Sequence, residues 1–415
     1  MAKKKKTNPI QTQKLAKAQH RNEYIKKLEF WCNKICGEKV FKHLPSDYID
    51  FIYACRCRSF KLEIAQEYSG KREIIKDCEM LIMNPLKNEN CSLSDQIPMV
   101  SFNDFYTVCL SLSLIKNDID KKRRTFGSYV DEILMKLEII QLKFEDISKT
   151  LNITLCAFGY HSSEMGKQIY WLNYDLCKQN KDNHFLRNII KIQNNTLEMD
   201  SISIDKSPRP IIRVGWPFAN FGIDYISIKP NQLGVKSQFA DIPMNVYIQS
   251  HALMRLSERI DSFYTGILHL NIFYSLKDLV FCYDKNGRIL IEYRIFDVKV
   301  GYFRADIIEG KIILRTFLFI TNNSTPESQK LEHNTGLQKF DIEYLAINKL
   351  SSFMNSDISN NEAVKKILID ADCQCLLELY DKLKTSMTKT TDTFDSESLL
   401  QYLQYKKVEE MQTTT

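Results

Sequence analysis

Apolar residues recur at helical spacing through residues 26–150, and this pattern predicts a helical N-terminal domain. The stretch from Gly127 to Leu151 is its longest amphipathic part. An earlier helix is expected to end at Pro85, because proline disfavours helix at the residue before it. Residues 1–25 are basic and polar, and a segment with so little apolar surface to bury predicts a disordered, solvated tail.

Residues 151–245 change to a mixed α/β pattern. Prolines divide this region into short elements, because proline cannot donate a hydrogen bond within a central strand. The predicted elements are a strand at 153–158, a helix at 183–192, and strand-like pieces at 202–204, 211–214 and 225–228.

Residues 246–322 show the clearest pattern. A short strand leads into a predicted helix at 250–260, with Ser250 as its N-cap. Strands rich in Ile, Val, Phe and Tyr follow, and turns at Asn286-Gly287 and Glu309-Gly310 predict two antiparallel hairpins. We expect the helix to pack against the sheet, which places the chain in the α+β class.

The C-terminal part returns to helical spacing. A polar stretch at 323–335 predicts a loop, and helices are expected at 340–353 and 361–383, packed back on the preceding unit. The final Ser/Thr-rich segment predicts a flexible tail with a short helix near 399–411. The predicted organisation is a basic tail (1–25), a helical domain (26–150), a mixed region (151–245), an α+β unit (246–322), a helical segment (323–384) and a flexible tail (385–415).

Composition and charge exclude several classes of protein. The net charge of +6 on 415 residues is only mildly basic and does not by itself require a nucleic-acid partner. No apolar run is long enough to span a membrane and no secretory signal is seen, so we expect a cytoplasmic protein with no membrane partner. The twelve cysteines lack the spacing of a disulfide scaffold or zinc site, and nucleotide-binding glycine motifs are missing. We therefore expect no metal and no cofactor.

The predicted helix at 250–260 has one polar and one apolar side. Leu253, Leu256 and Ile260 would face a core, and the polar stripe consists of His251, Arg255, Glu258 and Arg259. The order H-A-x-x-R-x-x-x-R on this helix, followed by antiparallel strands ending in I-L-R-T-F, resembles small toxin-type ribonuclease domains. That grouping includes barnase, EndoU, colicin nucleases and RelE. The resemblance covers residues 246–322, and the residues that carry it are His251, Ala252, Arg255, Arg259, Arg315 and Thr316.

The resemblance implies an RNA-interacting protein of toxin or defence type, and the residues suit metal-independent RNA cleavage. That reaction needs a base for the 2′-hydroxyl, an acid for the leaving 5′-oxygen, and cations on the phosphorane. His251 would be the base, and the helix N-terminus with Arg255 would favour its neutral form. Arg255 and Arg259 would hold the phosphate, and Arg304 or Arg315 would supply a further cation.

Two other interpretations fit the same residues. The polar stripe is also typical of an ordinary solvated helix, with Arg255 beside Glu258 and with Arg315 paired to Glu292 or Asp306 across the sheet. A non-enzymatic protein that binds nucleic acid or a protein partner, such as an inhibitor, fits as well. Geometry separates them, since an active site needs His251 and at least two of the arginines at one open cleft.

Two basic runs are further candidate contacts for nucleic acid. One is Lys121, Lys122, Arg123 and Arg124, predicted to form an exposed loop that contacts phosphates. The other is Lys3 to Lys6 in the N-terminal tail. Runs of this kind are also common as solvated surface with no partner.

Overall fold

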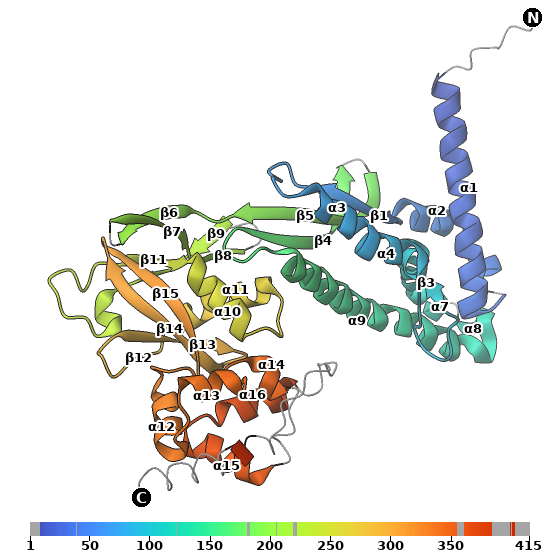
Figure 1. The fold of residues 1–415 in the computed structure, drawn as a ribbon. Helices are drawn as coiled ribbons and strands as arrows, with labels where there is room; N and C mark the ends of the chain where they lie inside the picture. The colour runs from blue at the N-terminus through green and yellow to red at the C-terminus, as the bar shows by residue number, and fades with distance from the viewer. Residues whose placement is uncertain are drawn as a thin grey trace, which may run out of the picture. The chain divides into compact units, whose positions relative to one another are not determined.

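The computed structural model describes residues 9–38, 40–121, 123–180, 183–204, 206–218, 222–354, 361–383, 399 and 401–402. The chain folds into two compact units (Figure 1). Unit 1 comprises Met1–Gly159 and Tyr170–Asn194, and unit 2 comprises Tyr160–Ile169 and Asn195–Thr415. Helices and strands are mixed along the chain, so the predicted α+β class is confirmed. Within the described residues, no helix combines the length and apolar character needed to cross a membrane.

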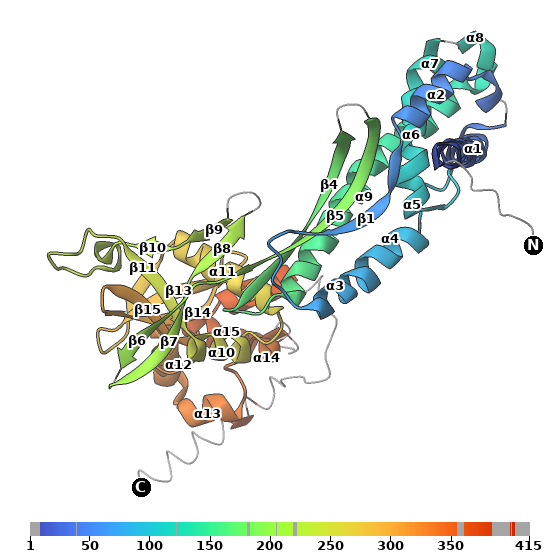
Figure 2. The same ribbon diagram turned by 90° about the horizontal axis from the view of Figure 1, so that it is seen from above.

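Unit 1 consists of helices around a three-stranded sheet. Helix α9 runs along this sheet (Figures 1 and 2), and Leu155 and Phe158 share one buried cluster with Leu172 and Ile190 of the strands. The helices are α1 (Pro9–Cys36), α2 (Ser46–Ala54), α3 (Arg72–Cys78), α4 (Asn84–Asn88), α5 (Phe102–Asp104), α6 (Leu110–Leu112), α7 (Lys116–Lys121), α8 (Arg123–Phe126) and α9 (Val130–Ser162). The strands of the sheet lie in the order β1 (Cys57–Ile64), β5 (Asn183–Thr196) and β4 (Gln168–Asn180). Strands β2 (Asn90–Cys91) and β3 (Val100–Ser101) form a separate two-stranded sheet.

The prediction of a disordered tail at 1–25 is wrong for its second part. Helix α1 begins at Pro9, where proline suits the first turn of a helix. Apolar residues at helical spacing hold its later turns in the core, and they are Tyr24, Leu28, Trp31, Cys32 and Ile35. The composition of residues 1–25 did not indicate this helix, because the first buried residue of α1, Tyr24, lies at the end of that segment. Lys3 to Lys6 lie outside the described residues.

Strand and helix predictions at four places are corrected by the structure. Strand β1 lies inside the predicted helical domain and pairs in parallel with β5, where 183–192 was predicted to be helical. The predicted strand at 153–158 is instead part of α9. The helix before Pro85 continues through it into α4 by way of a π-helical turn at Glu79–Met83. The predicted mixed region 151–245 is divided between the two units.

Unit 2 is built on one large mixed sheet. The predicted hairpins are confirmed: β12 pairs with β13, and β14 pairs with β15, both antiparallel. Strand β15 also pairs in parallel with β11, which extends the sheet to β7 and β6. The strands of the sheet lie in the order β12 (Phe281–Tyr283), β13 (Ile289–Ile295), β14 (Val298–Ile308), β15 (Lys311–Phe319), β11 (Met244–Gln249), β7 (Ser207–Arg213) and β6 (Met199–Ile204). Strand β10 (Ser227–Ile228) also pairs with β11. Strands β8 (Gly215–Phe218) and β9 (Gly222–Tyr225) form a separate two-stranded sheet.

Two helices cover one face of this sheet. Helix α10 (Ser250–Arg259) packs as predicted, because Ala252, Leu253 and Leu256 are buried in the same core as the strands. Helix α11 (Thr265–Lys277) was not anticipated from the sequence. The predicted N-cap Ser250 is instead the first residue of α10, and Gln249 occupies the cap position without a side-chain cap bond.

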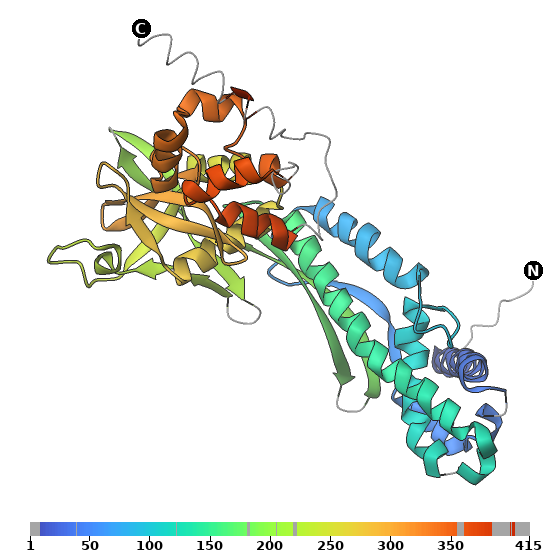
Figure 3. The same cartoon turned by 90° about the horizontal axis from the view of Figure 1, so that it is seen from below.

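The C-terminal helices join the same core beside the strands (Figure 3). The predicted loop at 323–335 contains α12, because the Thr325 hydroxyl accepts a hydrogen bond from the Ser328 N–H and Pro326 follows the cap. The predicted helices at 340–353 and 361–383 are each divided in two. The helices are α12 (Pro326–Thr335), α13 (Lys339–Tyr344), α14 (Leu350–Met354), α15 (Glu362–Asp370) and α16 (Cys375–Leu383). The predicted flexible tail at 385–415 lies outside the described residues apart from 399 and 401–402.

A buried histidine should make unit 2 sensitive to acid. His269 of α11 is fully buried, and its Nε2 lies 3.0 Å from the Gly215 carbonyl oxygen. Burial lowers the pKa of His269 from 6.5 to about 4. Between pH 6.5 and 4 the unfolded chain therefore binds a proton at His269 that the folded chain does not bind. The contribution of neutral His269 to the free energy of unfolding is fully present above pH 6.5 and is lost as the pH drops toward 4. At about 1.4 kcal/mol per unit, the full loss is roughly 3 kcal/mol.

Urea unfolding at a series of pH values between 7 and 4 would measure this loss. In His269→Gln, whose side-chain amide can still donate to the Gly215 carbonyl, the acid-dependent loss should shrink by roughly 3 kcal/mol relative to wild type. Parallel pH profiles of the two proteins would contradict the assignment to His269.

Candidate active-site cavity

A cavity of about 670 Å³ in unit 2 gathers four of the six predicted catalytic residues. His251, Arg304, Arg315 and Thr316 all line it, and they come from three elements: α10, β14 and β15. The volume lies within the range of small-molecule and cofactor pockets. The described residues that line it are Arg209, Pro210, Gln249, Ser250, His251, Arg304, Arg315 and Thr316.

The N-terminus of α10 forms one wall of the cavity. His251 is the second residue of this helix and its side chain is exposed. The first N–H groups of a helix have no partner inside it, and here no side chain at the cap position satisfies them. The positive end of the helix dipole thus adds to the arginine charges, and the wall favours an anion.

Arg315 is held in place by two neighbours. Its Nε donates to Oε1 of Gln249 at 3.0 Å, and its Nη1 lies 3.1 Å from Oδ2 of Asp306. Of the two partners that the sequence suggested, Asp306 is therefore confirmed, while Glu292 pairs with Arg294 instead. The side-chain oxygen of Gln249 accepts from Arg315 and does not cap α10. This hydrogen bond links the guanidinium to the start of the helix.

Arg304 lies beside Thr316 in the sheet. These two residues are partners in the register of β14 and β15, on strands that also carry Asp306 and Arg315. The Nε of Arg304 is shielded from solvent and has no hydrogen-bond partner among the described residues. A shielded donor without a partner is costly, so this guanidinium is suited to an anionic ligand that supplies an acceptor.

Arg255 and Arg259, the other two predicted catalytic residues, do not line the cavity. Each turn of a helix advances about 5.4 Å, so they lie one and two turns beyond His251, away from the helix start. Arg255 pairs with Glu258 at 2.8 Å on the surface, as the solvated-helix interpretation predicted. Arg259 is half-buried, and burial followed by the charge of Arg255 lowers its pKa.

The sequence did not identify Arg209 or Gln249 as site residues. Gln249 directly precedes the predicted helix, so its place beside His251 could have been recognised. Arg209 lies between two prolines in β7, about 40 residues before the helix, and it reaches the cavity only because β7 pairs with β11. That pairing left no local signal in the sequence.

In the second predicted site, the basic run at 121–124, the described residues Lys121, Arg123 and Arg124 are helical rather than part of a loop. Lys121 ends α7 and is exposed, and Lys122 lies outside the described residues. Arg123 pairs with Asp120 and Asp131 at 2.8 and 2.9 Å, and these hydrogen bonds raise its pKa. Arg124 lines a separate cavity of about 710 Å³ in unit 1. A phosphate-binding role for this run stays a prediction. Arg123 is the weaker candidate for it, because two carboxylates already balance its charge.

Comparison of the chain with protein-family models, with curated proteins and with solved structures finds no match in any of the three. The resemblance of residues 246–322 to toxin-type ribonucleases therefore rests on the residues themselves.

Proposed function

We propose that this chain binds RNA at the cavity in unit 2 and cleaves it there as a metal-independent endoribonuclease of toxin or defence type. One observation carries the proposal: His251 shares a cavity with three arginines, Arg209, Arg304 and Arg315. A phosphodiester matches that lining, because guanidinium groups bind phosphate oxygens through paired hydrogen bonds. None of the described residues that line the cavity is a carboxylate, so the lining itself offers little to a divalent cation.

In the proposed reaction the RNA supplies its own nucleophile. His251 accepts the proton of the 2′-hydroxyl, and the 2′-oxygen forms a bond to the adjacent phosphorus. Arg304 and Arg315 stabilise the added negative charge while the bond from phosphorus to the 5′-oxygen breaks. Water protonates the leaving oxygen, so the products are a 2′,3′-cyclic phosphate and a 5′-hydroxyl.

The second candidate is a non-enzymatic protein that binds RNA or a protein partner without cleavage, and one observation favours it. Among the described lining residues, His251 is the only side chain of a type that commonly transfers protons in catalysis, so no second side chain is placed to act as general acid. Asp306 also offsets part of the positive charge of Arg315. A cavity of this kind can hold a phosphate without breaking it.

The test uses the full chain, a mixed RNA pool and a chelator. We expect cleavage in the presence of EDTA, with cyclic phosphate and 5′-hydroxyl ends identified by mass spectrometry. A matched strand of 2′-deoxyribose should bind but stay intact, because it lacks the nucleophile. Binding of RNA without cleavage would favour the second candidate. Cleavage only with a divalent metal, or cleavage of the deoxy strand, would contradict the mechanism.

A further inference from the structure

Helix α1 has two halves with different surroundings. Its later half packs into unit 1, where Tyr24, Leu28 and Ile35 are buried. From Gln13 to His20, in contrast, every residue is exposed. In Figure 1 this earlier half stands clear of the other elements of unit 1. The exposed half buries no apolar surface of its own, so packing does not account for its sequence.

The exposed half lies in the most basic part of the chain. Residues 1–36 contain ten lysines and arginines but two glutamates, a net charge of +8, whereas the whole chain carries +6. The remaining 379 residues are therefore slightly acidic, at –2. Lys14 and Lys17 lie about one turn apart on the same side of the helix, and neither forms an ion pair with any described residue.

Further cations lie where the exposed half meets the rest of unit 1. Arg56 and Arg58 are close to His20, whose pKa is lowered by burial and by their charges, with Glu23 opposing. Arg21 follows Lys17 on the same side of α1 but pairs with Asp50. Arg58 is exposed, so positive charge continues from α1 toward the start of β1.

We propose that the exposed half of α1, through Lys14 and Lys17, with Arg58 near His20 at the end of this half, is a docking surface for the phosphate backbone of RNA. The choice of RNA rests on the proposed function, while the docking itself does not require cleavage. The surface belongs to unit 1, so it supplies a contact outside the cavity of unit 2.

The side chains of this half favour phosphate over bases and over lipid. Between Gln13 and Asn22 there is no Phe, Tyr or Trp on which a base could stack. The same stretch contains Leu15 as its single large apolar residue, and a membrane-surface helix needs a continuous apolar face. Charge complementarity therefore points to a polyanion read through its backbone, without sequence preference.

The experiment compares two double variants for binding to a non-cleavable 2′-O-methyl RNA. Lys14→Gln/Lys17→Gln should weaken binding on the order of tenfold at about 0.1 M salt and reduce the slope of log K against log salt by about 2. Glutamine keeps the helix propensity of lysine. The control, Lys76→Gln/Lys149→Gln, removes two lysines of unit 1 that are also exposed on helices, and it should stay within about twofold of wild type.

The outcomes separate this inference from the proposed function. Cleavage of a dinucleotide, which has a single phosphodiester and so offers no further backbone phosphate for a second contact, should be unchanged in Lys14→Gln/Lys17→Gln. Equal weakening in both double variants, or in neither, would overturn the docking surface even if wild type cleaves RNA. Selective weakening in a protein that leaves all RNA intact would support the docking surface and reject the proposed cleavage.

Discussion

Replacing His251 with alanine should slow RNA cleavage by about 10²–10⁴, because a positioned base contributes that much to proton transfer. The free energy of unfolding should change by less than about 0.5 kcal/mol, since His251 is exposed and lies on the polar side of α10. Single-turnover cleavage rates and urea unfolding measure the two quantities on the same preparation.

His333→Ala is the matched control for this variant. His333 is also exposed on a helix of unit 2 but does not line the cavity. Its removal should leave the cleavage rate unchanged. A similar slowing in His251→Ala and His333→Ala, or cleavage by His251→Ala at the wild-type rate, would show that His251 is not the base.

The arginines divide into two groups in the same assay. Arg304→Lys and Arg315→Lys should each cleave poorly, because a lysine provides one charge where the cavity presents a planar, paired donor. Arg255→Ala should cleave nearly normally, although the sequence placed Arg255 beside His251. Its ion pair with Glu258 is about two-fifths exposed on both sides, and such surface pairs contribute about 0–1 kcal/mol.

The parts of this fold that local rules determine could be predicted from the sequence. The turns at Asn286-Gly287 and Glu309-Gly310 close their hairpins because the glycine of each turn adopts a positive φ, of 74° in Gly287 and 70° in Gly310. The buried side of α10 likewise follows from helical spacing alone. Strand β5 lies between β4 and β1 in its sheet, and its parallel pairing with β1, more than 120 residues earlier, could not be predicted in this way.

The candidate site shows the same division. The resemblance to toxin-type ribonucleases placed His251 and Arg315 in one site. The structure brings them together because strand β11 leads directly into α10 and lies beside β15. The parallel register of β11 and β15 then places Gln249 where it can accept from Arg315. Arg255 was assigned to the site from the motif and from its helical face, and neither specifies which end of the helix a cavity occupies.

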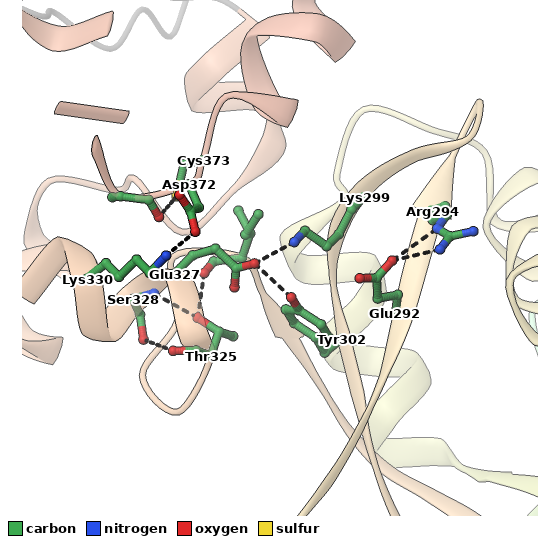
Figure 4. A network of polar contacts seen from close by, with 12 residues as sticks. Glu292, Arg294, Lys299, Tyr302, Thr325, Glu327, Ser328, Lys330, Asp372 and Cys373 are labelled. Atoms are coloured by element: carbon green, nitrogen blue, oxygen red, sulfur yellow. Dashed lines mark hydrogen bonds and ion pairs between the residues drawn. The ribbon is translucent and has the colours of Figure 1, made fainter. Parts of the chain in front are cut away.

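A large stability effect in unit 2 is expected at a buried carboxylate that joins α12 to β14 (Figure 4). Glu327 is 3% exposed, and its Oε1 accepts from Lys299 Nζ at 2.6 Å and from Tyr302 Oη at 2.7 Å. Its Oε2 has no hydrogen-bond partner among the described residues. Burial and then the Glu327 charge raise the pKa of Tyr302, so the phenol stays a neutral donor. The negative charge of Glu327 is therefore balanced chiefly by Lys299.

Lys299→Met should destabilise unit 2 by about 3 kcal/mol in urea unfolding, since it keeps the length of the side chain but leaves Glu327 charged and buried. That figure is at the low end for a broken buried pair because the Lys299 side chain is one quarter exposed. Lys299→Met/Glu327→Gln should recover most of the loss, because the cost arises from the unpaired charge and the glutamine oxygen can still accept from the buried Tyr302 hydroxyl.

Lys330→Met is the matched control, in the same helix as Glu327. The pair of Lys330 with Asp372 is more than half exposed on both sides, so its loss should cost about 0–1 kcal/mol. If the double variant were less stable than Lys299→Met, the ion pair would have to stabilise the fold by itself. If Lys299→Met and Lys330→Met lowered the free energy of unfolding by the same amount, water would have to reach the Glu327 carboxylate. The network would then behave as a solvent-exposed ion pair.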